Sequence, residues 1–190
     1  MVIPNPVSRD IFYEERMFNE ESPVMLFIGS TPNKNLPRVI EALREVPCRL
    51  HVVGILSDAD KIALREASIE YEVFFDLTGN EMAARYAGAD IVLFPSTFEG
   101  FGMPVIEGQK AGRVVITSNI SPVKEVSGDG ACLVDPYSVN SIREGIKRVI
   151  RNKEYRENLI RSGFENVRKY EPGSIAMCYE SLYDKILKMY

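Results

Sequence analysis

The sequence is poor in the residues that build common catalytic and metal sites. It has one histidine, His51, no tryptophan, and three cysteines that lie far apart. A single histidine argues against a Ser-His-Asp apparatus and against a multi-histidine metal site. His51 falls within a predicted strand, so we interpret it as a core residue. With no EF-hand pattern either, we expect no bound metal.

The chain also lacks a strong charge of either sign. It carries 23 Lys and Arg residues against 27 Asp and Glu residues, which gives a net charge of −4 and a pI of about 5.2. A basic surface that could hold a phosphate backbone is therefore not expected, and nucleic acid is not an expected partner.

Targeting and membrane-spanning patterns are missing as well. Residues 1–6 lack the basic region and apolar core of a secretory signal, and no apolar run approaches the roughly 20 residues of a spanning helix. Cys48, Cys132 and Cys178 form no CxxC pair and fit the reduced, mostly buried cysteines of an intracellular protein. We expect a cytoplasmic protein, and peripheral association with the inner face of the cell membrane stays open.

What is present suits one folded domain. The chain has 190 residues, of which 45% are hydrophobic and 26% charged, enough for a sizeable core. Residues 1–22 are polar and irregular, which is typical of an interdomain linker or crossover tail. We expect a Rossmann-like domain at residues 23–170 and a separate C-terminal helix at 171–190.

Short apolar runs alternate with segments of helical periodicity. The predicted strands are Val24–Gly29, Arg49–Gly54, Tyr71–Phe75, Ile91–Phe94, Val114–Thr117 and Ala131–Val134. The predicted helices cover residues 36–43, 58–68, 80–87, 104–111, 142–150, 155–170 and 175–189, with Thr78 and Ser174 as N-caps of two of them. Six buried strands alternating with helices predict an α/β fold: a doubly wound, mostly parallel six-stranded Rossmann-like sheet with helices on both faces.

The stretch Phe94–Glu107 is the strongest candidate for a site. A buried strand runs into a loop with two glycines, and Pro104 then fits the first position of a helix, which would put Glu107 in its first turn. Glu107 is either a carboxylate favoured by the helix dipole or a bidentate acceptor for a vicinal diol, as on ribose.

The loop itself offers a second carboxylate and free backbone donors. Glu99 is either a solvated loop residue or a group near the reacting part of a ligand. Gly100 and Gly102 let backbone N–H groups approach hydroxyls or phosphate oxygens, because a Cβ would block them. Phe101 between the two glycines indicates a packed and rigid loop.

Lys34 follows the first strand, on the same side of the sheet as Glu99. It is either a solvated loop lysine or a cation that holds a diphosphate and offsets charge on a leaving phosphate. The preceding segment, Gly29-Ser30-Thr31-Pro32, is neither a P-loop nor GxGxxG. The hypotheses of an ATPase and of a nicotinamide-dependent oxidoreductase therefore lack their fingerprint.

Taken together, these motifs resemble the C-terminal domain of retaining family 4 glycosyltransferases (glycosyl transferases group 1), which have the GT-B fold. The resemblance runs over nearly the full length. It rests on these segments: Ile3–Pro6, Phe27–Gly29, Lys34–Leu36, Ala89–Ser96, Glu99–Glu107, Ile116–Asn119, Glu125–Val126 and Val134–Pro136. Glu99–Glu107 has the E-x7-E form inside a PS-x-x-EGFG-x-P frame.

The resemblance implies a site for a nucleoside-diphosphate sugar and retaining, metal-independent hexosyl transfer. It makes residues 23–170 the nucleotide-sugar donor-binding domain and residues 171–190 a C-terminal crossover helix. Glu107 would hold the ribose hydroxyls, Glu99 would lie by the donor sugar, and Lys34 would pair with the diphosphate. Glu99 and Lys34 are thus the implied catalytic residues. The other implied donor-binding residues are Gly29, Ser30, Leu77, Thr78, Gly100, Phe101, Gly102 and Met103.

Position in the fold predicts base recognition by backbone groups around Phe74–Thr78. The donor is expected to be a GDP- or UDP-sugar, and the Lys34-Asn35 pair favours GDP-mannose. The acceptor would be a glycan or a lipid-linked glycan in the synthesis of cell-surface polysaccharide.

The sequence departs from the family pattern in two ways. Many members carry an arginine, a second cation that binds the diphosphate, where this chain has Ser30. One of the two cations is therefore missing here or comes from elsewhere. The family's N-terminal acceptor domain is not in this sequence, so we expect the isolated chain to bind nucleotide weakly and to transfer no sugar. One alternative is a non-catalytic nucleotide-sugar binding or assembly module. Another is a Rossmann-type oxidoreductase, although the absence of GxGxxG counts against it.

Overall fold

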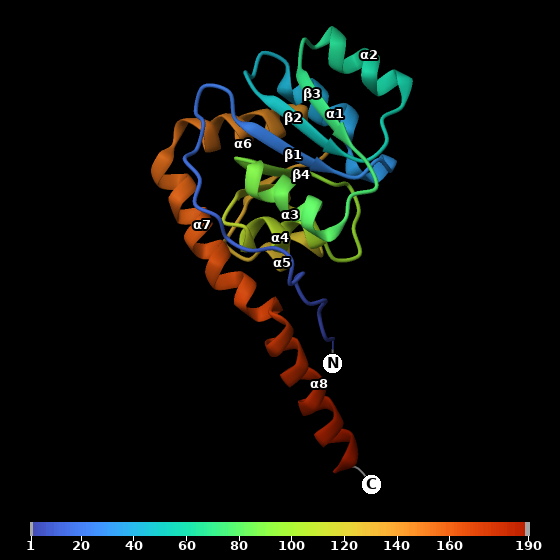
Figure 1. Cartoon of the computed structure of the whole chain (residues 1–190), viewed down its shortest axis with the longest axis vertical. Helices are drawn as coiled ribbons and strands as arrows, with labels where there is room; N and C mark the ends of the chain where they lie inside the picture. Colours follow the sequence, from blue (N-terminus) through green and yellow to red (C-terminus); the bar gives the residue numbers. More distant parts are fainter. Residues whose placement is uncertain (1, 189–190) are drawn as a thin grey trace.

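The computed structural model describes residues 2–188 and contains a six-stranded, fully parallel sheet between two layers of helices (Figure 1). The strands are β1 (Val24–Ile28), β2 (Arg49–Val53), β3 (Glu70–Phe74), β4 (Ile91–Phe94), β5 (Val114–Ser118) and β6 (Cys132–Val134). The α-helices are α1 (Leu36–Leu43), α2 (Asp58–Glu66), α3 (Gly79–Gly88), α4 (Met103–Lys110), α5 (Val123–Ser127), α6 (Val139–Arg151), α7 (Lys153–Val167) and α8 (Pro172–Leu187). Two short 3₁₀ helices are η1 (Pro32–Lys34) and η2 (Arg168–Tyr170).

The strand order is β3-β2-β1-β4-β5-β6, so the chain winds outward in one direction from β1 and in the other from β4. The register pairs Met25 with Ile91 across β1 and β4, and Leu26 with Val92. In open α/β sheets, ligands bind beyond the carboxyl ends of the strands where the winding reverses. The fold therefore directs attention to the loops that follow β1 and β4.

Alternating strand residues supply two separate apolar cores. Phe27 and Leu93 face a core with α1, α2 and α6, whereas Leu26 and Phe94 face a core with α3, α4 and α5. All four side chains are at most 1% exposed. Because both faces of the central strands are covered, these strands form continuous apolar runs in the sequence.

The N-terminal segment, residues 2–22, has no helix or strand but packs along the domain (Figure 1). Val7 and Ile11 are buried in the second core, and the Val7 backbone N–H donates to the Tyr170 carbonyl at 2.7 Å. Arg16 pairs with the buried Asp90 at 3.1 Å. These contacts make the segment part of the folded unit.

Helix α8 extends away from the body of the domain, as Figure 1 shows. Among its residues only Ile175 is buried. The predicted cap Ser174 is wrong: the helix begins at Pro172 with Glu171 as N-cap, and the Ser174 hydroxyl donates to the Arg168 carbonyl. Proline at the first helical position sets that earlier start. Met189, also placed in this helix by periodicity, lies outside the described residues.

The structure confirms the α/β class, the six strands and the Thr78 cap, and it corrects three further expectations. Strand β3 is not buried: as an edge strand it leaves Glu72 and Val73 exposed. The five-residue helix α5 was not predicted, because a single turn is too short to show a helical period. The expected loop before α1 contains η1, which Pro32 opens. Within residues 2–188, no helix combines the length and apolar character needed to cross a membrane.

Candidate functional site

The loops after β1 and β4 meet at the point where the winding of the sheet reverses. The loop after β1 runs from Gly29 through η1 to Asn35, and the loop after β4 runs from Pro95 to Gly102. Backbone and side-chain hydrogen bonds join them directly: Thr97 N–H donates to the Asn33 carbonyl at 2.8 Å, and the Asn33 side-chain amide donates to the Phe98 carbonyl at 2.8 Å. The two loops form one connected surface.

Lys34 and Glu99 form an ion pair at the centre of this surface. Lys34 Nζ lies 2.6 Å from Glu99 Oε1, and the two side chains are only 19% and 12% exposed. The ammonium also lies 4.8 Å from the centre of the Phe94 ring. Gly29 makes room for the lysine, because a Cβ there would come within 2.7 Å of the Lys34 side chain. The sequence placed both residues on one side of the sheet, and the structure brings them into contact.

Asn35 fixes the first loop to two others. Its side-chain amide is 2% exposed and donates to the carbonyls of Pro95 at 2.9 Å and Pro136 at 2.7 Å. The backbone of Asn35 adopts a left-handed conformation with φ of 71°, which asparagine tolerates better than most residues. Asn35 thus ties together the loops after β1, β4 and β6, and thereby fixes the position of its neighbour Lys34.

Glu107 lies on α4 and is bonded to a tyrosine from α3. The Tyr86 hydroxyl donates to Glu107 Oε2 at 2.7 Å. Burial raises the pKa of Glu107, and the hydrogen bond from Tyr86 opposes this rise. The expected place of Glu107 in the first turn is wrong: Gly102 is the N-cap and Met103 the first helical residue, so Glu107 lies in the second turn.

The glycines of the loop have different roles. Gly102 adopts φ of +100° and its missing Cβ would come within 2.6 Å of the Val123 side chain, so both backbone conformation and packing favour glycine. At Gly100 a Cβ would meet no heavy atom within 4 Å, so open space lies beside its backbone. Phe101 packs edge to face on Tyr170 with ring centres 5.7 Å apart, as expected for a packed loop.

The remaining candidate residues surround this surface. Met103 is half-buried at the start of α4. The Ser30 hydroxyl accepts from the Ile55 backbone N–H at 2.5 Å, so it joins the ends of β1 and β2 and offers no charge. Thr78 is the N-cap of α3, with a capping box completed by Glu81, and the half-buried Leu77 precedes it. Leu77 and Thr78 lie in the loop after β3, two strands from β1.

Sequence reasoning missed the supporting role of two groups, the asparagines Asn33 and Asn35 and the tyrosine Tyr86. Of these, Asn35 was considered only as part of the Lys34-Asn35 pair. Asparagine is favoured in turns, so an asparagine between the candidate lysine and the next helix could have indicated a residue that fixes the loop. For Tyr86 no local signal exists, because its partner is 21 residues away in the sequence and on another helix.

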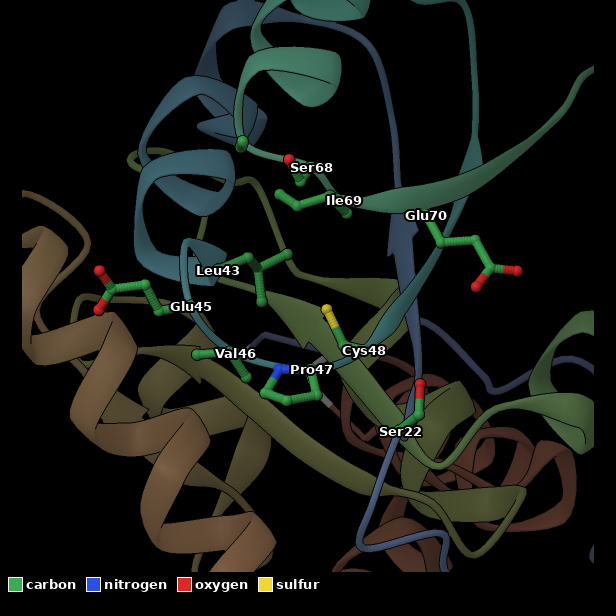
Figure 2. A pocket seen from close by; sticks show the side chains of 10 residues that line it. Ser22, Leu43, Glu45, Val46, Pro47, Cys48, Ser68, Ile69 and Glu70 are labelled. Carbon is green, nitrogen blue, oxygen red and sulfur yellow. The ribbon is translucent and has the colours of Figure 1, made fainter.

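A wide cavity of about 580 Å³ opens at the opposite end of the strands, where β2 and β3 begin (Figure 2). Figure 2 shows the Cys48 sulfur inside it, with the Glu45 and Glu70 side chains pointing away from one another. Burial raises the pKa of Cys48 to about 11, which disfavours a reactive thiolate. Ligand sites bring a few polar groups to one point, and this cavity does not.

A second cavity, of about 510 Å³, adjoins the candidate loop. It is lined by Gly100 and Phe101 of the loop, by Ile3 and Pro4 of the N-terminal segment, and by Glu125. No group of three or more metal-ligating side chains occurs within the part of the chain that the structure describes. The chain has one Asp-x-Asp, Asp58 and Asp60, in the first turn of α2, where Asp60 completes a capping box with Ser57.

The arrangement can hold an anion beside a polar organic group. Lys34 offers a cation with three N–H donors, of which Glu99 takes one. The backbone near Gly100 is accessible, and Glu107 offers carboxylate oxygens from the adjoining helix. The sheet is parallel and doubly wound, and these groups lie near the point where its winding reverses. This is the architecture of Rossmann-like α/β domains, in which ligands bind at that point.

The chain belongs to the family described as glycosyl transferases group 1, which it matches over residues 8–166. One relative is an O-antigen chain mannosyltransferase B of Escherichia coli, 28% identical over 159 residues, which cover 76% of this chain and 41% of that protein. The chain spans about half the length of the curated relatives it matches.

Solved structures show the same fold. A sucrose-phosphate synthase from Thermosynechococcus elongatus matches 99% of this chain and 53% of its own chain, with a TM-score of 0.84 and 20% identity. The C-terminal domain of a glycosyl transferase group 1 family protein from Francisella tularensis matches 86% of this chain and 97% of its own, with a TM-score of 0.72 and 20% identity. The chain has the fold of the C-terminal domain of a GT-B glycosyltransferase.

Proposed function

We propose that this chain is the donor-binding domain of a retaining hexosyltransferase and that it binds a nucleoside-diphosphate sugar without a metal. The Lys34–Glu99 pair carries the proposal, because it puts a cation and a carboxylate between the two loops where α/β folds bind ligands. Transfer itself would need a second domain that carries the acceptor, a glycan or lipid-linked glycan.

In this proposal Lys34 stabilises the negative charge of the departing nucleoside diphosphate. Two of its N–H groups remain for phosphate oxygens, and fixed donors of this kind stabilise charge as it develops when the glycosidic bond breaks. The backbone around Gly100, Phe101, Gly102 and Met103 would add N–H donors for sugar hydroxyls and phosphate.

Glu99 would then have two tasks. Its carboxylate accepts hydroxyl donors from the sugar, and its ion pair with Lys34 neutralises one charge of the site when the donor is absent. Without Lys34, Glu99 would repel the diphosphate, so we expect the two residues to be energetically coupled.

Base and ribose would lie toward β3. Glu107 would accept the two ribose hydroxyls, and backbone groups around Leu77 and Thr78 would contact the base. Gly29 and Ser30 would lie under the diphosphate, where Ser30 replaces a charged clamp with a neutral hydroxyl. The mannosyltransferase among the relatives supports GDP-mannose as the first donor to test.

A thermal-shift panel of GDP, UDP, ADP and their sugars identifies the ligand, since binding to the folded state raises the unfolding temperature. Calorimetry then follows the selected nucleoside diphosphate and its nucleoside. Lys34→Ala should weaken diphosphate binding about tenfold and nucleoside binding less than about twofold. Glu99→Gln added to Lys34→Ala should recover part of that loss.

The matched control is Lys61→Ala, which removes the same charge from the exposed face of α2. It should leave both affinities unchanged. Equal loss of diphosphate and nucleoside binding in Lys34→Ala would contradict the phosphate role. No binding of any nucleotide in the panel would overturn the proposal.

A non-catalytic nucleotide-sugar binding or assembly module is the second candidate, because the Lys34–Glu99 pair could hold a nucleoside diphosphate without any transfer of the sugar. The two candidates share the donor site and differ in turnover. Hydrolysis or transfer of a donor sugar, measured with the chain joined to an acceptor domain, separates them.

A further inference from the structure

The Tyr86 hydroxyl is a buried polar group that the proposed function does not use. The side chain is 0% exposed and lies in the apolar cluster formed by α3, α4, α5 and the N-terminal segment. Phenylalanine would fill the same space, and a buried hydroxyl is unfavourable unless it finds a partner. Its partner is the carboxylate of Glu107, at 2.7 Å.

This contact restricts Glu107 to one orientation. A glutamate side chain has several rotatable bonds, and ordering it on binding costs entropy. The hydroxyl of Tyr86 takes one lone pair of Oε2, which leaves Oε1 and a second lone pair of Oε2 available as acceptors. A vicinal diol needs two acceptors at fixed positions, and a carboxylate held in advance supplies them with less loss of entropy.

The pKa shifts of Tyr86 and Glu107 indicate which of the two donates the hydrogen bond. Burial raises the pKa of Tyr86 far above its usual range, so the hydroxyl keeps its proton and can only donate to the carboxylate. Burial also raises the pKa of Glu107, and the bond from Tyr86 works against that rise. Tyr86 donates the hydrogen bond that lowers the pKa of Glu107, and the core around the two residues is hydrophobic, with Tyr170 as its other buried tyrosine.

We infer that Tyr86 is a positioning residue that holds Glu107 for the ribose diol and thereby sets a preference for ribonucleotides over deoxyribonucleotides. The inference rests on the proposed function, which assigns the ribose to Glu107. It adds a residue from α3, the helix whose cap, Thr78, belongs to the loop proposed for the base.

The test compares GDP with 2′-deoxy-GDP, or the corresponding UDP pair if UDP binds more tightly. The wild-type chain should prefer the ribonucleotide about 10- to 100-fold, the usual range for hydrogen bonds to a charged group. Tyr86→Phe should reduce that preference to a few fold and leave 2′-deoxy-GDP affinity within about twofold of wild type.

Tyr155→Phe is the matched control. It removes a partly buried tyrosine hydroxyl from the other core, across the sheet, and should leave the preference unchanged. If Tyr86→Phe weakens both nucleotides equally, the residue has a structural role alone and the inference is wrong. If instead Glu107→Ala keeps the full preference, the ribose assignment in the proposed function is wrong.

A readout without nucleotide tests the contact in the wild-type chain itself, and this part does not depend on how well Tyr86→Phe folds. In the wild-type chain, NMR of the Tyr86 ring should follow the ionisation of Glu107 with the same midpoint as the Glu107 carboxyl carbon. In Tyr86→Phe the carboxyl carbon should titrate at higher pH, because the opposing hydrogen bond is gone. If the Tyr86 ring signals in wild type do not change as Glu107 ionises, the two groups are not in contact and the inference is wrong.

Discussion

At the scale of single residues, the candidate site contains charged side chains that are largely buried. Glu107 is a carboxylate whose pKa burial raises, so its charged form is less stable in the folded chain than in the unfolded one. Lys34 and Glu99 are mostly withdrawn from solvent and depend on one another for a counter-ion. A buried carboxylate that destabilises a domain, as Glu107 does, is typical of functional sites.

Glu107→Gln should therefore stabilise the ligand-free chain at pH 7. Since the folded pKa lies above 4.5, stability is highest when Glu107 is protonated and is lost as the pH rises through the folded pKa. A neutral glutamine avoids that loss, and we expect a gain of about 1 kcal/mol, or roughly 2–4 °C in Tm.

The gain should disappear below pH 4.5, where the carboxyl is protonated in both states. Thermal unfolding of both proteins at the two pH values measures this. A variant that is less stable than wild type at pH 7 would show that the carboxylate is better satisfied than its burial indicates.

At the scale of elements, helix α3 links two parts of the proposed donor site. Its N-cap lies in the loop after β3, and its last turns carry Tyr86 against Glu107. The cap is a reciprocal one, in which Thr78 accepts from Glu81 N–H at 3.4 Å and Glu81 accepts from Thr78 N–H at 2.8 Å. Loss of the cap should therefore affect both the helix and the ligand loop.

Thr78→Ala should lower the free energy of unfolding by about 1 kcal/mol and weaken nucleotide binding a few fold. The control is Asn152→Ala, which removes the N-cap of α7, where Asn152 accepts from Tyr155 N–H. That helix begins near the amino ends of the strands, away from the proposed site, since its residue Arg156 pairs with Glu20, which precedes β1. The control should show the same loss of stability in urea unfolding and unchanged nucleotide affinity.

How far these elements could be predicted from the sequence depends on whether the signal is local. Thr78 and Glu81 are three residues apart, so the N-cap of α3 could be predicted. The start of α4 was predicted one residue late, at Pro104, because the sequence does not show that Gly102 adopts the left-handed conformation of the N-cap. The Lys34–Glu99 contact spans 65 residues, so the shared side of the sheet could be predicted but the ion pair could not. Tyr86 was missed because only the folded core brings it to Glu107.

At the scale of the whole molecule, the two ends of the chain differ in how firmly they are attached. The N-terminal segment buries Val7 and Ile11 and bonds to Tyr170, whereas α8 buries Ile175 alone among its residues. Residues before the first strand therefore contribute to the stability of the domain, and most of α8 does not.

Truncation after Ile175 should shift Tm by less than about 2 °C, because the removed part of α8 that the structure describes packs on little of the domain. Deletion of residues 1–12 should remove two buried side chains and lower stability by about 3–6 kcal/mol. Thermal and urea unfolding of the two truncated chains compares them. Equal losses from both ends would contradict the packing described for the N-terminal segment.

The outer strands of the sheet determine how copies of this protein behave when crowded together. An unpaired strand edge offers backbone N–H and C=O groups to strands of other molecules and can start aggregation. Here one edge, β3, places the exposed Glu70 and Glu72 along its length, and the other edge, β6, has three residues. A second copy aligned on β3 would bring carboxylates against carboxylates, and β6 is too short to template a ladder. Both edges therefore oppose intermolecular sheet growth, which keeps the open sheet compatible with high protein concentration.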